Sequence, residues 1–144
     1  MRKATMCLLV ALCSLVAFGQ NQPQWKVVQS VILTQQTAAI SQTTIFTPER
    51  SGLYRLNAYI SGKAMNNIQF NPSLNFYFMC SDRFQQGDCG AFMGLNVHGP
   101  HTQYIGSYVF SPRPGTPVSY LTSVSNPPPM NLQYDLAFTI EQLQ

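Results

Sequence analysis

The sequence predicts an all-β protein, an antiparallel two-sheet sandwich of about eight strands that is jelly-roll-like. Two distant segments support this prediction, because each alternates apolar and polar side chains as a half-buried strand does. Outside the N-terminal apolar run, no stretch keeps the period of a helix. The two apolar faces are therefore expected to meet in one core. Their members are Tyr54, Leu56, Ala58 and Ile60, and Leu132, Tyr134, Leu136, Phe138 and Ile140.

The first four expected strands are separated by turn signals. A stretch rich in Val and Ile comes first, and one rich in Thr and Ile follows; both compositions favour extended chain. A turn at 47–52 precedes the third strand, because Pro48 fixes its φ angle and Gly52 permits an unusual one. An asparagine-rich loop at 62–73 precedes the fourth, which is aromatic. These strands are expected at Trp25–Leu33, Thr37–Phe46, Leu53–Ser61 and Leu74–Cys80.

Four more strands are expected in the second half of the chain. The first returns antiparallel to the aromatic strand, and the next follows a turn at Gly99 and Pro100. A proline-rich turn at 111–115 and three prolines at 127–129 precede the last two, since proline cannot continue a central strand. We expect the first and last strands of the domain to lie near one another. The four are placed at Ala91–Val97, Gln103–Phe110, Pro117–Val124 and Leu132–Gln142.

The N-terminus has the pattern of a secretory signal peptide. Arg2 and Lys3 precede an apolar run at 6–18 that is too short to span a bilayer comfortably. Small residues near its end predict cleavage after Gly19, with cleavage after Ala17 as the alternative. An uncleaved anchor is the other alternative. The expected product is secreted, in the periplasm or outside the cell.

We therefore divide the chain into a signal peptide at 1–19, a polar leader at 20–24 and one jelly-roll domain at 25–144. The domain has a common size for a single folding unit. After cleavage, six basic residues stand against five acidic ones, and the basic ones are scattered singly. Nucleic-acid binding normally requires clustered Lys and Arg. We expect no nucleic-acid partner, no cofactor, and no membrane contact after signal cleavage.

Two of the four cysteines remain in the mature chain, Cys80 and Cys89. In an exported protein, a pair this close in sequence is expected to form a disulfide. The bridge would clamp a hairpin, and closing a loop of about ten residues would contribute on the order of 2–3 kcal/mol. A metal site would need more ligands than these two thiols.

Other candidate metal ligands are few. His98 and His101 flank a Gly-Pro turn and are weak candidates, because no third ligand accompanies them. Asp82 and Asp88 lie within the bridged loop and offer oxygen atoms to calcium, but without the alternating donors of calcium motifs. The sequence therefore predicts no metal.

Signals for catalysis are also weak. The G-x-S-x-G nucleophile motif is absent. Acid–base chemistry would require Glu49, Asp135 or Glu141, and the last two lie on outward strand faces. We expect no enzymatic activity.

Exposed aromatic side chains beside amides mark the candidate binding surface. Tyr59 and Tyr77 oppose the apolar faces of their strands, near amides of the same strands. Such rings stack on sugars or pair with a partner subunit. The alternative is packing against a loop or a neighbouring strand. The surface would also include the loop at 66–71 and the bridged loop, and its candidate residues are Tyr59, Tyr77, Asn57, Asn75, Asp82, Arg83 and Asp88.

Three motifs resemble uncharacterised small secreted bacterial β-sandwich proteins. They are I-F-T-P-E-R-S-G-L-Y-R at 45–55, P-G-T-P-V-S-Y at 114–120 and Y-D-L-A-F-T-I-E-Q-L at 134–143. The G-L-Y-R strand also resembles the G-x-Y strand of the complement C1q and tumour-necrosis-factor-like jelly rolls. That resemblance implies a homotrimer and partner binding, and it brings no catalytic residues. This chain departs from those jelly rolls by lacking a collagen-like stalk and by inserting the bridged loop.

The expected function is a secreted non-catalytic interaction or structural module, whose partner is another protein or the chain itself in a homotrimer. A carbohydrate-binding, lectin-like domain that uses Tyr59 and Tyr77 on a glycan is the alternative. A small secreted hydrolase is the third hypothesis.

Overall fold

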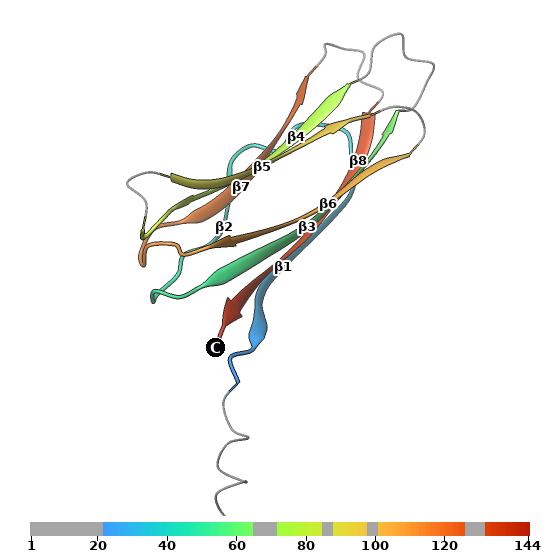
Figure 1. The fold of residues 1–144 in the computed structure, drawn as a ribbon. Coiled ribbons are helices and arrows are strands. Elements are labelled where there is room, and N and C mark those ends of the chain that lie inside the picture. The colour runs from blue at the N-terminus through green and yellow to red at the C-terminus, as the bar shows by residue number, and fades with distance from the viewer. Residues whose placement is uncertain (1–21, 65–71, 85–87, 98–100, 126–131) are drawn as a thin grey trace, which may run out of the picture.

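The computed structural model describes residues 22–64, 72–84, 88–97, 101–125 and 132–144. It is all-β, with eight antiparallel strands in two sheets of four (Figure 1), so the predicted fold class is confirmed. The strands are β1 (Trp25–Gln36), β2 (Thr43–Phe46), β3 (Tyr54–Ala64), β4 (Ser73–Ser81), β5 (Asp88–Asn96), β6 (Thr102–Phe110), β7 (Val118–Ser125) and β8 (Leu132–Leu143).

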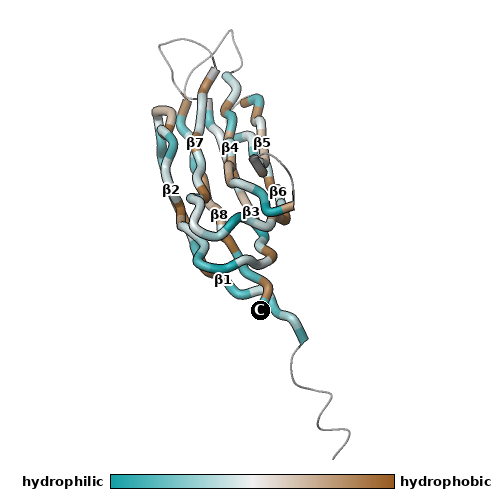
Figure 2. Tube along the Cα trace, turned by 90° about the vertical axis from the view of Figure 1, so that its left-hand side faces the viewer, coloured by the Kyte–Doolittle hydropathy of each residue, from teal (hydrophilic) through white to brown (hydrophobic). Residues whose placement is uncertain are grey.

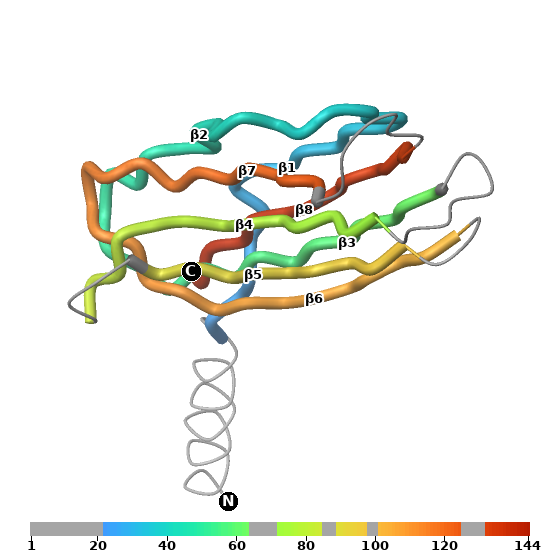
Figure 3. The backbone as a smooth tube through the Cα atoms, turned by 90° about the horizontal axis from the view of Figure 1, so that it is seen from above, coloured from blue at the N-terminus to red at the C-terminus, as the bar shows by residue number. Residues whose placement is uncertain are grey.

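The strand order is β1-β8-β3-β6 in the first sheet and β2-β7-β4-β5 in the second. Among the described strands, only β4 and β5 are consecutive in sequence and also neighbours in a sheet. Every other pair of consecutive strands is divided between the two sheets. This is a jelly-roll-like arrangement. Viewed from above, strands of the two sheets run in similar directions (Figure 3), which is the aligned packing of a sandwich.

The first and last strands pair, as expected. Trp25 lies opposite Leu143 at one end of the β1–β8 ladder, and Gln36 lies opposite Tyr134 at the other. β1 has a bulge at Val28. Val27 pairs with Glu141 and Gln29 pairs with Ile140, the adjacent residue of β8, so Val28 has no partner of its own in the ladder.

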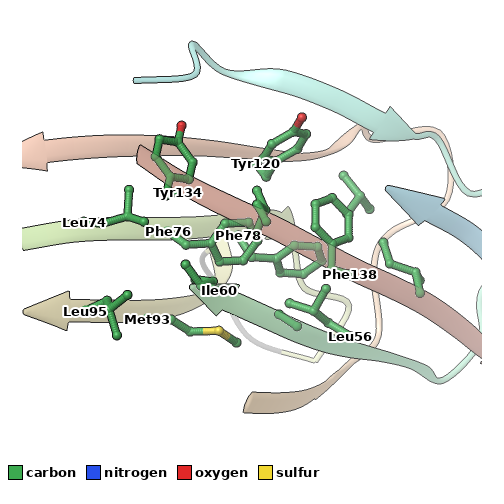
Figure 4. Close-up of a cluster of buried hydrophobic side chains, with 14 of the residues drawn as sticks. Leu56, Ile60, Leu74, Phe76, Phe78, Met93, Leu95, Tyr120, Tyr134 and Phe138 are labelled. Atoms are coloured by element: carbon green, nitrogen blue, oxygen red, sulfur yellow. The ribbon is translucent and has the colours of Figure 1, made fainter. Parts of the chain in front are cut away.

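The alternating side chains of β3 and β8 form the core, as their pattern predicts. Figure 2 shows hydrophobic and hydrophilic residues alternating along the strands. Rings from the two sheets meet in the interior (Figure 4), where Phe138 of β8 lies 5.7 Å from Phe76 and 5.1 Å from Tyr120 between ring centroids. These contacts between sheets hold the sandwich together.

Seven of the strands begin and end within three residues of their expected limits, but the second prediction is wrong in its first half. Only 43–46 is strand, whereas 37–42 is not. The reason is tertiary, because side chains hydrogen-bond to the backbone there. The Tyr134 hydroxyl donates to the Ala38 carbonyl oxygen at 2.8 Å.

Thr122 completes this link between β7, β8 and the segment before β2. The backbone N–H of Ile40 donates to Thr122 Oγ1 at 2.7 Å, and the Thr122 hydroxyl lies 2.8 Å from that of Tyr134. Because the proton of Tyr134 is used at Ala38, Thr122 donates to Tyr134. Burial raises the pKa of Tyr134, and the hydrogen bond with Thr122 offsets this in part.

The predicted disulfide joins Cys80 and Cys89, which lie directly opposite each other in the β4–β5 ladder with 4.9 Å between their Cα atoms. Both cysteines are buried. The bridge therefore clamps the hairpin, as predicted, and it fits an oxidising compartment.

The signal peptide at 1–19 lies outside the described residues, as do part of the leader and the loop at 66–71. Their assignments stay predictions. Within the described part of the chain, no helix has the length and apolar character needed to cross a membrane.

Candidate interaction surfaces

The outer face of the first sheet carries a row of apolar side chains across all four strands, which we call the apolar band. It consists of Ile32 of β1, Ala137 of β8, Tyr59 of β3 and Ile105 of β6, each opposite the next in the ladders. Ile32 and Ile105 are 72% and 75% exposed. Because Ala137 is small, the larger side chains beside it flank a groove of about 260 Å³.

A hydrogen-bonded row of polar side chains borders the apolar band on one side. Glu141 of β8 accepts from Arg55 Nε at 2.7 Å and from Asn57 Nδ2 at 3.0 Å, both on β3. Asn57 Oδ1 accepts from Ser107 of β6 at 2.9 Å. The guanidinium of Arg55 also lies 4.6 Å from the ring centroid of Trp25. This row therefore connects the same four strands as the apolar band.

A second polar row borders the apolar band on its other side. Asp135 of β8 accepts from the backbone N–H of Gln35 at 2.8 Å and from Ser61 at 3.3 Å. The Tyr59 hydroxyl donates to Gln103 at 3.4 Å. The apolar band thus lies between two polar rows, and within each row the polar groups are hydrogen-bonded to one another.

The outer face of the second sheet carries a smaller feature, which we call the Phe92 platform. It consists of Tyr77 and Asn75 of β4 and Phe92 and Gly94 of β5, which oppose each other in pairs. The rings of Tyr77 and Phe92 lie 5.1 Å apart between centroids and are tilted by 50°. Phe92 is 60% exposed.

The residues predicted to form one binding surface are divided between these faces. Asn57 and Tyr59 lie on the outer face of the first sheet, and Asn75 and Tyr77 on that of the second. The prediction of a single surface is therefore wrong for these residues. Tyr59 is exposed, whereas Tyr77 is partly covered, in agreement with the alternative of packing against a neighbouring strand.

The bridged loop also differs from its prediction. Asp82 is buried rather than exposed at a hairpin tip, because its carboxylate accepts from the Phe84 N–H at 2.7 Å and its backbone bridges to Pro112. Arg83 is exposed and lies over the Phe84 ring. Asp88 is the first residue of β5, and its side chain lies outside the described part.

A cleft of about 680 Å³ opens at the end of the sandwich that holds the 47–53 turn. Its lining includes Phe46, Glu49, Arg50, Tyr54 and Gln142. Burial raises the pKa of Tyr54, while the positive charge of Arg50 opposes that shift. The cleft offers aromatic rings and charges of both signs.

The carboxylates named as candidates for acid–base chemistry are not brought together. Glu49 lines the cleft, whereas Asp135 and Glu141 lie in the polar rows of the first sheet. His101 is exposed, and His98 lies outside the described residues. Within the described residues, no three His, Cys, Asp or Glu side chains come close enough to hold a metal ion.

Sequence reasoning missed Ile32, Ile105 and Phe92, which have the highest exposed fractions among the large apolar side chains described on the two outer faces. One signal could have found them, because these strands carry apolar residues at both odd and even positions. In β6, Ile105 and Val109 alternate with Tyr104, Tyr108 and Phe110. A strand that is apolar on both faces is expected to be covered on both.

Comparisons with known proteins identify no family. No family model and no curated protein matches the chain. One similar solved structure is that of infectious bursal disease virus, Gx strain, with 8% identity and a TM-score of 0.22 over 85% of this chain and 39% of that one. The chain thus spans well under half the length of that protein. A similarity this low supports no argument about function.

Proposed function

We propose that the protein is a secreted, non-catalytic interaction module that assembles with copies of itself through the outer face of the first sheet. The apolar band is the observation that carries this proposal. Ile32 and Ile105 remain largely exposed although their strands are long and paired. Contiguous exposed apolar side chains mark surfaces that a partner covers.

The surroundings of the apolar band support a protein partner. Protein interfaces have an apolar centre and a polar rim, and the two polar rows supply such a rim. Arg55, Asn57 and Asp135 are already hydrogen-bonded within the sheet. If a partner protein covered these polar groups, most of them would keep their hydrogen bonds within the sheet, and this limits the cost of removing them from water.

Charge favours a second copy of the chain as that partner. Assembly around a symmetry axis brings the same side chains of neighbouring copies close together, and the apolar band has no charged side chain that would repel its counterpart. Beside it, Arg55 and Glu141 form an ion pair. With six basic and five acidic residues in the mature chain, long-range repulsion between copies would be weak.

The number of copies in the proposal is three. It rests on the resemblance of the G-L-Y-R strand to the C1q and tumour-necrosis-factor-like jelly rolls. In a closed threefold assembly, the apolar band of each copy would face the common axis and be covered by its two neighbours. The predicted signal peptide would place the assembly outside the cytoplasm.

Measuring the mass of the mature protein in solution tests this proposal. Analytical ultracentrifugation over a range of concentrations should give three times the monomer mass. Ile105→Asp should give the monomer, because a buried unpaired carboxylate opposes assembly. Ile32→Asp should do the same from the other edge of the sheet.

Phe92→Asp is the matched control, because it places the same charge at an exposed apolar position on the opposite sheet. It should leave the mass unchanged. A wild-type protein that stays monomeric at every concentration would contradict the proposal, and so would an Ile105→Asp variant with unaltered mass. If the wild-type protein is a dimer and Ile105→Asp dissociates it, the outer face of the first sheet is the contact surface but the assembly is not a trimer.

The other two hypotheses have less support. Tyr59 belongs to the apolar band, so assembly would cover it and leave only Tyr77 for a glycan. A hydrolase has no catalytic arrangement in its favour among the described residues, because Glu49 is separated from the carboxylates of the first sheet. Turnover in a broad substrate screen would revive it.

A further inference from the structure

We infer that the Phe92 platform is a binding site for a neutral sugar, with the C–H face of one pyranose ring stacked on Phe92 and one hydroxyl hydrogen-bonded to Asn75. The site lies on the second sheet, away from the apolar band. The inference therefore goes beyond self-assembly and does not depend on it.

Gly94 is the position that shapes the platform. A Cβ atom built there would lie 3.2 Å from Cζ of Phe92 and 3.3 Å from Oδ1 of Asn75. The Phe92 ring therefore lies over Gly94, along the sheet, with its other side open to solvent. An aromatic ring and an amide converge at one point, as stacking plus one directional hydrogen bond requires.

The position of the ring in the sheet leaves it accessible. β5 is the edge strand of its sheet; β6 of the other sheet lies near it on the side of the buried Met93, whereas Phe92 points to the opposite side and is 60% exposed. Gly90 and Gly94 flank it on the same face of the strand and carry no side chains that could cover it. Tyr77 packs against the ring on the side toward β7, at an interplanar angle of 50°. A ligand can therefore approach the ring without any rearrangement.

The chemistry of this face disfavours an anionic ligand. Next to the rings, the outward-facing side chains are amides, hydroxyls and apolar groups, including Asn75, Ser123, Leu121 and Met79. The sequences of β4, β5 and β7 contain no Lys or Arg, and their one acidic residue is Asp88 at the start of β5, whose side chain lies outside the described part. An anionic sugar or a phosphate would find no cation here, whereas a neutral pyranose requires none.

The size of the platform also favours a sugar over larger or more apolar ligands. A stable protein interface buries about 800 Å² on each partner, far more than two rings and one leucine provide. A drug-like apolar ligand needs a concave site that covers most of its surface. The open face of the Phe92 ring matches the C–H face of one sugar ring, and the Tyr77 ring, tilted by 50° beside it, offers a second contact.

Binding to a panel of neutral soluble oligosaccharides tests the inference. The panel contains cello-, xylo-, manno-, galacto- and chito-hexaoses, and a pectic hexaose serves as the anionic comparison. We expect at least one neutral member to bind with a Kd of about 1 mM or below and to shift the NMR amide signals of Asn75, Phe92 and Gly94. The anionic oligosaccharide should not bind.

Substitutions localise the effect. Phe92→Ala should weaken binding by about ten-fold or more, and Gly94→Val should weaken it while retaining the ring, because added methyl groups lift Phe92 off the sheet. Phe92→Tyr should retain binding. Tyr59→Ala, which removes an exposed aromatic ring from the first sheet, should leave it unchanged.

Three results would overturn the inference. They are the absence of binding by every neutral oligosaccharide, binding that survives Phe92→Ala, and binding that Tyr59→Ala abolishes. Loss of the oligomer in Phe92→Ala would also overturn it, since the platform would then be a contact between copies. The sedimentation mass and the sugar titration are separate readouts, so either proposal can fail alone.

Discussion

The outer faces of the two sheets differ although both sheets contribute to one core. On the first sheet, exposed side chains form rows that cross all four strands, and hydrogen bonds connect one of the polar rows from Ser107 through Asn57 to Glu141. On the second sheet, the exposed aromatic residues are confined to β4 and the edge strand β5, next to glycine. A wide apolar surface suits a protein, and a narrow aromatic one suits a small rigid ligand.

This difference shows that the inward residues constrain the fold while the outward ones remain free to diverge. Leu56 and Leu136 are fully buried, and their strands would keep that packing with many other outward sequences. Function is therefore expected to be specified by the outward positions. The following substitutions test whether the two faces are independent.

The disulfide should have the largest effect on stability, and of the two proposed sites it should affect only the one on the second sheet. Replacing both Cys80 and Cys89 by serine is expected to lower the free energy of unfolding by about 2–3 kcal/mol, as measured by urea denaturation. Sugar binding should weaken, because the bridge fixes the hairpin that carries Phe92. The sedimentation mass should not change. Loss of assembly in a folded double variant would show that the faces are coupled.

The Tyr134 hydroxyl should have the next largest effect, because it joins the two sheets. Tyr134→Phe removes its hydrogen bonds to Ala38 and Thr122 and is expected to cost about 1–2 kcal/mol. Neither sugar binding nor the mass should change at neutral pH. Tyr120→Phe is the control and should cost less, because Tyr120 hydrogen-bonds Thr43 but does not link the segment before β2.

The same tyrosine predicts how stability depends on pH. Because burial raises the pKa of Tyr134, the folded protein holds this proton to higher pH than the unfolded chain does. The stabilisation is complete below the unfolded pKa of about 10 and is lost as the pH rises through the folded value. Urea midpoints should therefore fall at alkaline pH, and less steeply in Tyr134→Phe. Equal slopes for both proteins would contradict this origin.

The ion pair of the first sheet should have the smallest effect on stability. Glu141→Gln is expected to cost about 0.5–1 kcal/mol, because Arg55 is partly exposed and water screens the pair. The loss should shrink at high salt. If assembly weakens much more than stability does, the polar row takes part in the contact between copies; if both stay unchanged, it is only a border of the apolar band.

The sequence predicted the fold well because alternation is a local property. Tyr54 to Ile60 and Leu132 to Ile140 are buried at every second position, as their pattern required. The prediction of a strand at 37–42 was wrong because Tyr134 and Thr122, which are far away in sequence, hydrogen-bond to the backbone at 38–40. A local pattern contains no information on such partners.

The candidate surfaces were harder to predict for a related reason. Alternation shows that Tyr59 and Tyr77 point away from the core, but it does not show which sheet each strand joins. Their separation onto opposite faces follows from the order β1-β8-β3-β6 and β2-β7-β4-β5. Tyr77 lies opposite Phe92 because of the register of the β4–β5 hairpin. The predicted disulfide indicates this register only at Cys80 and Cys89.

The order of strands has a consequence for how the chain acquires its structure. β4 and β5 can pair as soon as both are synthesised, whereas β1 must wait for β8, more than a hundred residues later, before Trp25 meets Leu143. Contacts this distant along the chain slow folding. During that interval, the backbone of the Val- and Ile-rich β1 has no partner strand, and unpaired strands can associate with other chains. The first strand therefore remains open to pairing with other chains until the last strand is available to cover it.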